Sequence, residues 1–205
     1  MVLTNRLLPF LVRRWKDEDV LTGQERVGLV VSTSYGTGRE VLVRATEAIA
    51  RRSAVLATKY GAAVIYAPCS YLFPGAERVE ADLKERVFAE YGVKTHRADS
   101  MENTVQEARS IASYISQHNL QHGHLLIVTG EMHSRSARWI WTRVMPKSKI
   151  TVTCVPYTWE YQPDQPVYAQ RGPWKWLSAN VARQTLLWTP GIGLRIGAIH
   201  HRSTG

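Results

Sequence analysis

"LLIVTGEMHSRSARWIW", residues 125–141, changes within a few positions from an aliphatic run to histidine, arginine and tryptophan. Its first half is a short apolar run of the kind that forms a strand covered on both faces of a parallel sheet. The polar residues after it are typical of the start of a helix. His133 would therefore lie where a strand ends and a helix begins, and ligands of open α/β sheets bind at that edge.

Strand-like and helix-like segments alternate on both sides of this stretch. The alternation predicts right-handed crossovers and a doubly wound, mostly parallel sheet of about five strands with helices on both faces, a Rossmann-like α/β sandwich of three layers. The predicted strands are 26–32, 62–67, 92–97, 124–129 and 149–155. The predicted helices are 39–60, 75–91, 103–119, 133–145 and about 174–187.

The length of 205 residues and the hydrophobic content of 44% suit one core and a single domain overall. We expect a helical or irregular lead-in (1–25), a Rossmann-like core (26–155) and a Trp-rich basic extension that packs on the core (156–205). Cys69 and Cys154 fit no metal or disulfide spacing, which favours a reducing compartment. The apolar run "LLPFLV" near the N-terminus is too short for a membrane span or signal peptide, so we expect a cytoplasmic protein.

The net charge of +9 is concentrated in the C-terminal third. Residues 1–129 hold 16 basic and 14 acidic side chains, whereas residues 130–205 hold 10 and 3, together with six of the seven tryptophans. One interpretation is a nucleic-acid-binding module in which aromatics stack on bases. Another is peripheral contact with a membrane surface. We favour a third, in which the tryptophans 139, 141, 174, 176 and 188 are core and the basic residues form a solvated face.

All strands of a parallel sheet end at one edge, so the loops after the first four predicted strands should meet there. Helix N-termini at that edge attract anions, which predicts a small anionic ligand. His133 would act as general acid or base, since an ordinary histidine pKa near 6.5 suits proton transfer. Asp99 and Glu80 would supply carboxylates, and Arg135 or Arg138 would counter the charge of the ligand.

The remaining residues predicted to bind the ligand come from the same loops. They are Ser32, Thr33, Gly36, Ser70, Ser100, Asn103, Thr104 and Thr129. No metal site is predicted, because His118, His122 and His124 have no acidic or cysteine partners nearby in the sequence and are more typical of a solvated connector. The alternative role for His133 is structural, as a helix N-terminal residue bonded to a neighbouring loop.

The stretch "SMENTVQEA" at residues 100–108, followed by a buried strand ending in Thr129 and then by His133, resembles the YdcF/SanA/ElyC-like family. Glu80 and Ala81, placed twelve residues before a Gly-Val pair, add to the resemblance, which covers about residues 27–145. This family is a bacterial domain of unknown function with a Rossmann-like fold. The resemblance implies a link to cell-envelope processes and a nucleotide-like or S-adenosylmethionine-like ligand or cofactor.

Three motifs depart from the family pattern. The family's Gly-Gly pair after the second strand is replaced by "PCSY" at residues 68–71, and its T-x-E-N motif has Gln106 and Glu107 at the last two positions. In its H-x-x-R-A motif, Ser136 replaces the arginine. Arg135 and Arg138 flank Ser136 and share a helix face, so we expect one of them to take over the role of that arginine.

Overall fold

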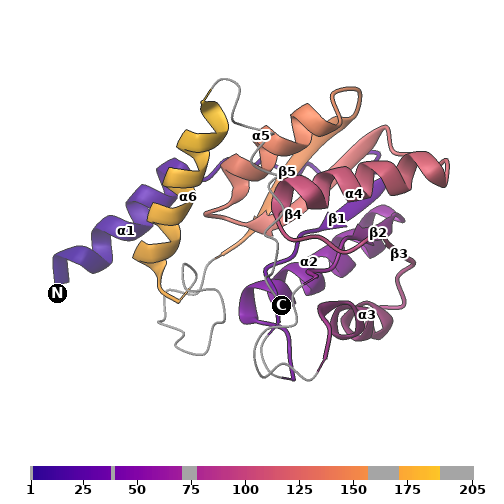
Figure 1. Cartoon of the computed structure of the whole chain (residues 1–205), viewed down its shortest axis with the longest axis horizontal. Coiled ribbons are helices and arrows are strands. Elements are labelled where there is room, and N and C mark those ends of the chain that lie inside the picture. The colour runs from indigo at the N-terminus through magenta and orange to yellow at the C-terminus, as the bar shows by residue number, and fades with distance from the viewer. Residues whose placement is uncertain (1, 38–39, 71–77, 157–170, 190–205) are drawn as a thin grey trace, which may run out of the picture.

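The computed structural model describes residues 2–37, 40–70, 78–156 and 171–189, with side chains from residue 7 onward. Its five strands form one sheet in the order β3-β2-β1-β4-β5, and every pairing is parallel (Figure 1). The predicted α/β class with a doubly wound parallel sheet is therefore confirmed. The strands are β1 (Leu29–Ser32), β2 (Ala63–Tyr66), β3 (Thr95–Arg97), β4 (His124–Gly130) and β5 (Lys149–Val155).

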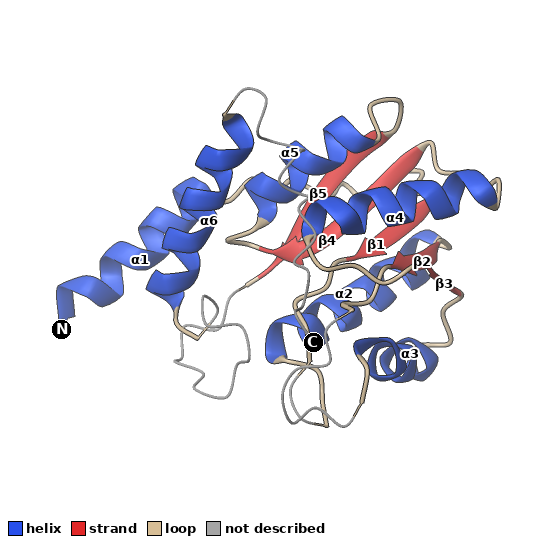
Figure 2. Cartoon of the chain, in the orientation of Figure 1, coloured by secondary structure: helices blue, strands red, loops and turns tan. Residues whose placement is uncertain are grey.

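Helices cover both faces of the sheet (Figure 2). They are α1 (Val2–Trp15), α2 (Arg44–Tyr60), α3 (Glu80–Glu90), α4 (Thr104–Gln117), α5 (Ser134–Val144) and α6 (Pro173–Trp188). The helices α2 and α3 share one hydrophobic core with one face of the strands, and α4 and α5 share a second core with the other face. The predicted lead-in is thus largely helical, since α1 occupies most of it.

The central strands are hydrophobic on both faces because each face meets a layer of helices. In β1, Val30 faces the core of α2 and α3, while Leu29 and Val31 face the core of α4 and α5. Residues of β4 alternate in the same way, with Leu126 on the first side and Ile127 on the second. This arrangement explains why β1 and β4 are continuous apolar runs rather than alternating ones.

Helix boundaries follow local chemistry. The helix α2 stops at Gly61, whose φ of 62° lies in the left-handed region that glycine adopts without strain. At the start of α4, the Asn103 side chain accepts hydrogen bonds from the backbone N–H groups of Val105 and Gln106, as an N-cap does. The helix α2 begins only at Arg44, five residues later than predicted, because Leu42 forms an antiparallel bridge with Thr37 and Val43 is extended.

The segment after α1 covers the edge strand β5. The Asp19 N–H donates to the Val152 carbonyl, and carboxylates of Asp19 and Glu18 accept from the N–H groups of Val152 and Cys154. These bonds satisfy groups that an exposed edge strand would offer to another chain. Residues 17–19 are therefore part of the sheet's protection.

Two predictions about burial need correction. Trp141 and Trp176 are core residues, but Trp174 is 41% and Trp188 57% exposed, because both lie on the outer face of α6. His124 is not solvated: it belongs to β4, is buried, and its Nε2 lies 2.8 Å from the Thr151 hydroxyl. No helix in the described ranges is long and apolar enough to cross a membrane.

Candidate functional site

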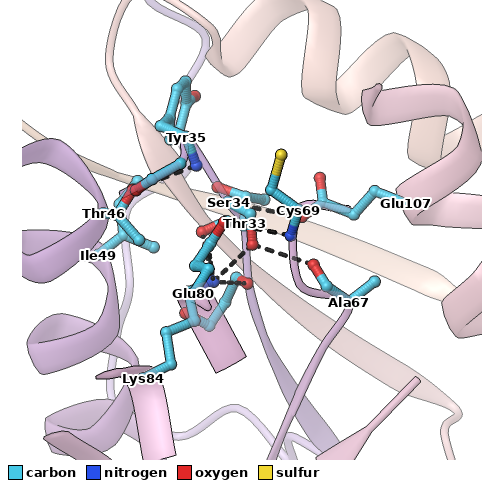
Figure 3. A network of polar contacts seen from close by, with 12 residues as sticks. Thr33, Ser34, Tyr35, Thr46, Ile49, Ala67, Cys69, Glu80, Lys84 and Glu107 are labelled. Atoms are coloured by element: carbon cyan, nitrogen blue, oxygen red, sulfur yellow. Dashed lines mark hydrogen bonds and ion pairs between the residues drawn. The ribbon is translucent and has the colours of Figure 1, made fainter. Parts of the chain in front are cut away.

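A buried ion pair lies beneath the loop that follows β1. The ammonium of Lys84 donates to the carbonyl oxygens of Ser32 and Thr33 at 3.0 Å and to the Ser34 hydroxyl at 2.7 Å (Figure 3). These oxygens use its three N–H groups, and Glu80 Oε1 lies 3.3 Å away, one helical turn earlier in α3. The second Glu80 oxygen accepts from the Cys69 N–H. The pair thereby joins the loops after β1 and β2.

A second buried carboxyl, Glu107 in the first turn of α4, meets the same loop. Its Oε1 accepts a hydrogen bond of 3.0 Å from the Ser34 N–H, while the Ser34 hydroxyl donates to the Ala67 carbonyl. Burial raises the pKa of Glu107 to about 8; the ammonium of Lys84 opposes this shift and the carboxylate of Glu80 adds to it. Glu107 is thus mostly protonated at neutral pH and presents a carboxylic acid.

His133 lies at the N-cap position of α5 and is almost fully buried. Its Nε2 is 3.2 Å from the Thr104 hydroxyl and its Nδ1 is 3.1 Å from Asn180 Oδ1. The amide oxygen of Asn180 only accepts, which fits the tautomer that has its hydrogen on Nδ1 and accepts from Thr104 at Nε2. Burial, then the charge of Arg183, lowers the pKa of His133 to about 3, while the hydrogen bond to Asn180 opposes that shift. The imidazole is therefore neutral.

Arg183 brings a guanidinium to this histidine from α6. Its Nη1 lies 3.1 Å from His133 Nδ1 and 3.3 Å from Asn180 Oδ1. In the tautomer with a hydrogen on Nδ1, the guanidinium donates to the Asn180 oxygen. Although part of Arg183 is exposed, burial lowers the pKa of its guanidinium, so the end beside His133 and Asn180 is largely shielded from water.

The Tyr35 side chain lies between His133 and β4. Its hydroxyl lies 2.9 Å from the Thr129 hydroxyl, and its ring packs edge-on against His133 and Trp176. Burial raises the Tyr35 pKa, so the phenol stays protonated. A Cβ added at Gly130 would lie 3.4 Å from the Trp176 ring, which shows how closely α6 covers the end of β4.

We call Glu80, Lys84, Glu107 and His133 the edge cluster, because all four lie at the carboxyl edge of the sheet and none is more than 2% exposed. The structure places several predicted site residues in or beside it: Ser32, Thr33, Glu80, Asn103, Thr104, Thr129 and His133. Gly36 lies in the same loop, where its carbonyl accepts from the Thr46 hydroxyl. Ser70, Asp99 and Ser100 are exposed residues of the loops at the rim.

The structure does not bring Arg135 and Arg138 to this edge. Arg135 donates to the carbonyls of Arg14 and Trp15, and Arg138 forms ion pairs of 2.9 and 2.8 Å with Asp17 and Asp19. Arg135 turns toward the end of α1 and Arg138 toward the segment after it. This geometry does not support the expectation that Arg135 or Arg138 counters the charge of a ligand at the carboxyl edge. We call Asp17, Asp19, Arg135 and Arg138 the N-terminal clamp.

Sequence reasoning missed Lys84, Glu107, Tyr35, Asn180 and Arg183. Two of them had a local signal. Lys84 lies four residues from Glu80 and four from Phe88, and Glu107 lies four residues before Ile111, so each charge falls on the apolar stripe of an amphipathic helix. Asn180 and Arg183 had none, because only the packing of α6 on α5 places them beside His133.

A groove of about 580 Å³ lies away from this cluster, at the opposite edge of the sheet between the C-terminal ends of α4 and α5. It is lined by residues such as Ile115, His122 and Lys147 and contains none of the predicted site residues. We place the candidate site at the edge cluster because the buried ionisable groups are there. Among the residues that the structure describes, no group of three or more His, Cys, Asp or Glu side chains could hold a metal ion.

Comparison of the sequence with protein-family models and with curated proteins finds no match.

Proposed function

We propose that the protein binds a small anionic ligand at the carboxyl edge of its sheet, between the loop after β1, the start of α4 and the end of β4. The observation that carries this proposal is the burial of the edge cluster. Burying a charged or titratable side chain costs free energy, and hydrophobic residues could fill the same volume at lower cost. Strongly perturbed ionisable groups at a ligand edge are typical of functional sites.

The anionic character of the ligand is supported by two features around His133. Thr104 and His133 lie at the N-terminal, positive ends of α4 and α5, respectively. Arg183 adds a guanidinium beside His133. We therefore favour a phosphate- or nucleotide-like compound, and the S-adenosylmethionine-like ligand, in which only the carboxylate is anionic, stays a prediction of the resemblance. Membership of the YdcF-like family, a link to the cell envelope and a cytoplasmic location belong to this proposal as predictions of the sequence.

With these protonation states, His133 and Glu107 would have roles that differ from those of a histidine and a glutamate with ordinary pKa values. Neutral His133 would accept a hydrogen bond at Nε2, so a ligand hydroxyl that displaces the Thr104 hydroxyl would bind there. Protonated Glu107 would donate one hydrogen bond. In this proposal the two groups orient the ligand, and proton transfer by His133 requires that ligand binding raise its pKa toward neutrality.

A thermal-shift screen of nucleotides, S-adenosylmethionine, sugar phosphates and isoprenoid phosphates tests the proposal. A ligand at one hundred times its dissociation constant stabilises the fold by about 2.7 kcal/mol. Thr104→Val and Arg183→Gln should each weaken the ligand's effect, whereas Arg143→Gln, the same change at an exposed arginine at the C-terminal end of α5, should not. Equal ligand responses in all three variants would contradict the proposed site.

The alternative function is a nucleic-acid-binding module in the basic, aromatic C-terminal third. Trp141 and Trp176 are core residues, and Arg135 and Arg138 already bind the N-terminal segment, so these four side chains are poorly available to bases or phosphates. A salt titration separates the two functions, because binding to a phosphate backbone weakens steeply with salt. A small ligand held in a buried site should respond much less.

A further inference from the structure

The outer face of α6 carries an uncharged stripe with a tryptophan at each of its two ends. Trp174, Ser178, Val181, Thr185 and Trp188 follow one another at alternating spacings of four and three residues, which places them on one side of the helix. All five are exposed. At 1.5 Å per residue the two tryptophans are about 21 Å apart along the axis. We call these five residues the α6 stripe.

The two hydroxyl groups of the stripe are turned back onto their own helix. The Ser178 hydroxyl donates to the carbonyls of Trp174 and Lys175, and the Thr185 hydroxyl donates to that of Val181. Such bonds satisfy a hydroxyl donor without water. The α6 stripe therefore combines apolar side chains with polar groups that already have a partner, a composition suited to an environment poorer in water.

The helix α1 lies beside α6 and has exposed apolar side chains of its own. Leu7 and Phe10 are each about half exposed, and the Arg14 guanidinium lies 4.7 Å from the centre of the Phe10 ring. Arg13 and Arg14 of α1 are joined by Lys175 of α6, and neither helix contains an acidic residue. Exposed apolar side chains and an excess of basic residues are thus concentrated on two neighbouring helices.

We propose that α6 and α1 dock the protein on an anionic membrane surface. Tryptophan prefers the interface between headgroups and acyl chains, because its ring is apolar and its N–H is polar. Basic side chains beside an amphipathic helix are attracted by anionic lipids. A second copy of the chain is a poorer occupant, since two surfaces that carry basic and no acidic residues on these helices would repel each other.

Vesicle flotation of the full chain tests this proposal, with vesicles of phosphatidylcholine alone and with an equimolar mixture of phosphatidylcholine and phosphatidylglycerol. The chain should float with the anionic vesicles and much less with the neutral ones. The double variant Trp174→Ser with Trp188→Ser should bind at least about tenfold more weakly. The double variant Arg13→Gln with Arg14→Gln should lose about fivefold per arginine, and only on anionic vesicles.

A matched pair of valine variants separates the α6 stripe from general surface hydrophobicity. Val181 in α6 and Val55 in α2 are 41% and 43% exposed, so Val181→Ser and Val55→Ser remove similar apolar surface from two helices. Only Val181→Ser should reduce flotation. Equal losses, or full binding by the double tryptophan variant with circular dichroism unchanged, would overturn the proposal.

Two further measurements distinguish other occupants of the same surface. Analytical ultracentrifugation without lipid would reveal a dimer that the tryptophan variant lacks, which would assign the α6 stripe to a second copy. Fluorescence anisotropy with a labelled single-stranded RNA would reveal nucleic-acid binding. A chain that does not float with anionic vesicles overturns membrane docking, and a dimer or bound RNA would then identify the other occupant. Flotation that the double tryptophan variant loses supports membrane docking.

Discussion

The edge cluster and the N-terminal clamp both gather charged side chains beside the same sheet, but they accommodate charge in different ways. In the clamp, Arg138 meets two carboxylates, and all three side chains keep between 24% and 39% of their surface in water. In the edge cluster, one ammonium lies near two carboxyls, and a neutral imidazole lies at the same edge of the sheet; all four side chains are almost fully buried.

The comparison distinguishes surface ion pairs, which can stabilise the fold, from buried ionisable groups, whose burial costs free energy. The clamp matches opposite charges at the surface, where each pair contributes little and costs little. The edge cluster is balanced only if Glu107 holds a proton, and it keeps His133 uncharged. Such an arrangement is hard to explain by stability alone, which is why the proposed ligand site lies at the carboxyl edge.

The largest expected effect is that of removing the buried ammonium. Lys84→Met should lower the free energy of unfolding by about 3–5 kcal/mol, because it leaves Glu80 and two strand-end carbonyls without their partner. Urea denaturation measures the loss, with Lys94→Met, at an exposed position, as the control. The double variant that also carries Glu80→Met should recover part of it. A loss below about 1 kcal/mol would mean that Lys84 contributes no more to stability than the surface ion pairs of the N-terminal clamp do.

The second prediction concerns pH. Glu107 has a folded-state pKa of about 8, above its ordinary 4.5, so the folded state keeps a proton that the unfolded chain has released, and stability falls as pH rises through this window. His133 has a folded-state pKa of about 3, below its ordinary 6.5, so stability rises with pH between these values. The two contributions oppose each other between pH 4.5 and 6.5, and only the loss from Glu107 continues up to pH 8.

Glu107→Gln tests this balance. Between pH 6.5 and 8 the parent should lose up to about 2 kcal/mol through Glu107, which the glutamine variant should not lose. Between pH 4.5 and 6.5 the variant should instead gain stability with pH, because the contribution of His133 is no longer opposed. Urea denaturation at a series of pH values gives both slopes. Parallel curves for the two proteins would mean that Glu107 titrates as a solvated carboxylate does.

The third prediction is a structural control for the edge itself. Asn103→Ala should cost about 1 kcal/mol of unfolding free energy, because its side chain accepts from the N–H groups of Val105 and Gln106. Asn103→Asp keeps the capping oxygen and should retain most of the stability. If Asn103 also helps to hold the ligand, the alanine variant will lose ligand stabilisation as well. Loss of stability with an unchanged ligand response would limit Asn103 to its cap.

The smallest effect should come from the clamp. Arg138→Gln should cost about 0.5–1 kcal/mol, because its two ion pairs are partly hydrated. Most of that difference should vanish in concentrated salt, which screens exposed charges. Ligand binding should be unchanged in Arg138→Gln and in Arg135→Gln. A loss of ligand response in either variant would mean that the clamp arginines also take part in ligand binding, which contradicts the distinction drawn between the clamp and the edge cluster.

The amino-acid sequence by itself determined the frame of the protein. The apolar runs at residues 125–128 and 149–155 predicted buried parallel strands, because only a sheet covered on both faces makes such runs favourable. Asn103 before an amphipathic stretch predicted a helix start, since its short side chain caps free N–H groups. The place of His133, between a strand and a helix, followed from the same local patterns.

Only the tertiary structure decided which partners the side chains of these strands and helices contact. Arg135 and Arg138 do share a helix face, but that face meets residues 14–19, and no local pattern fixes the rotation of a helix against a distant segment. Asn180 and Arg183 reach His133 across 47 and 50 residues of sequence because α6 packs on α5. Helical periodicity is a local property, whereas the partner of each face is fixed by long-range packing of the whole core.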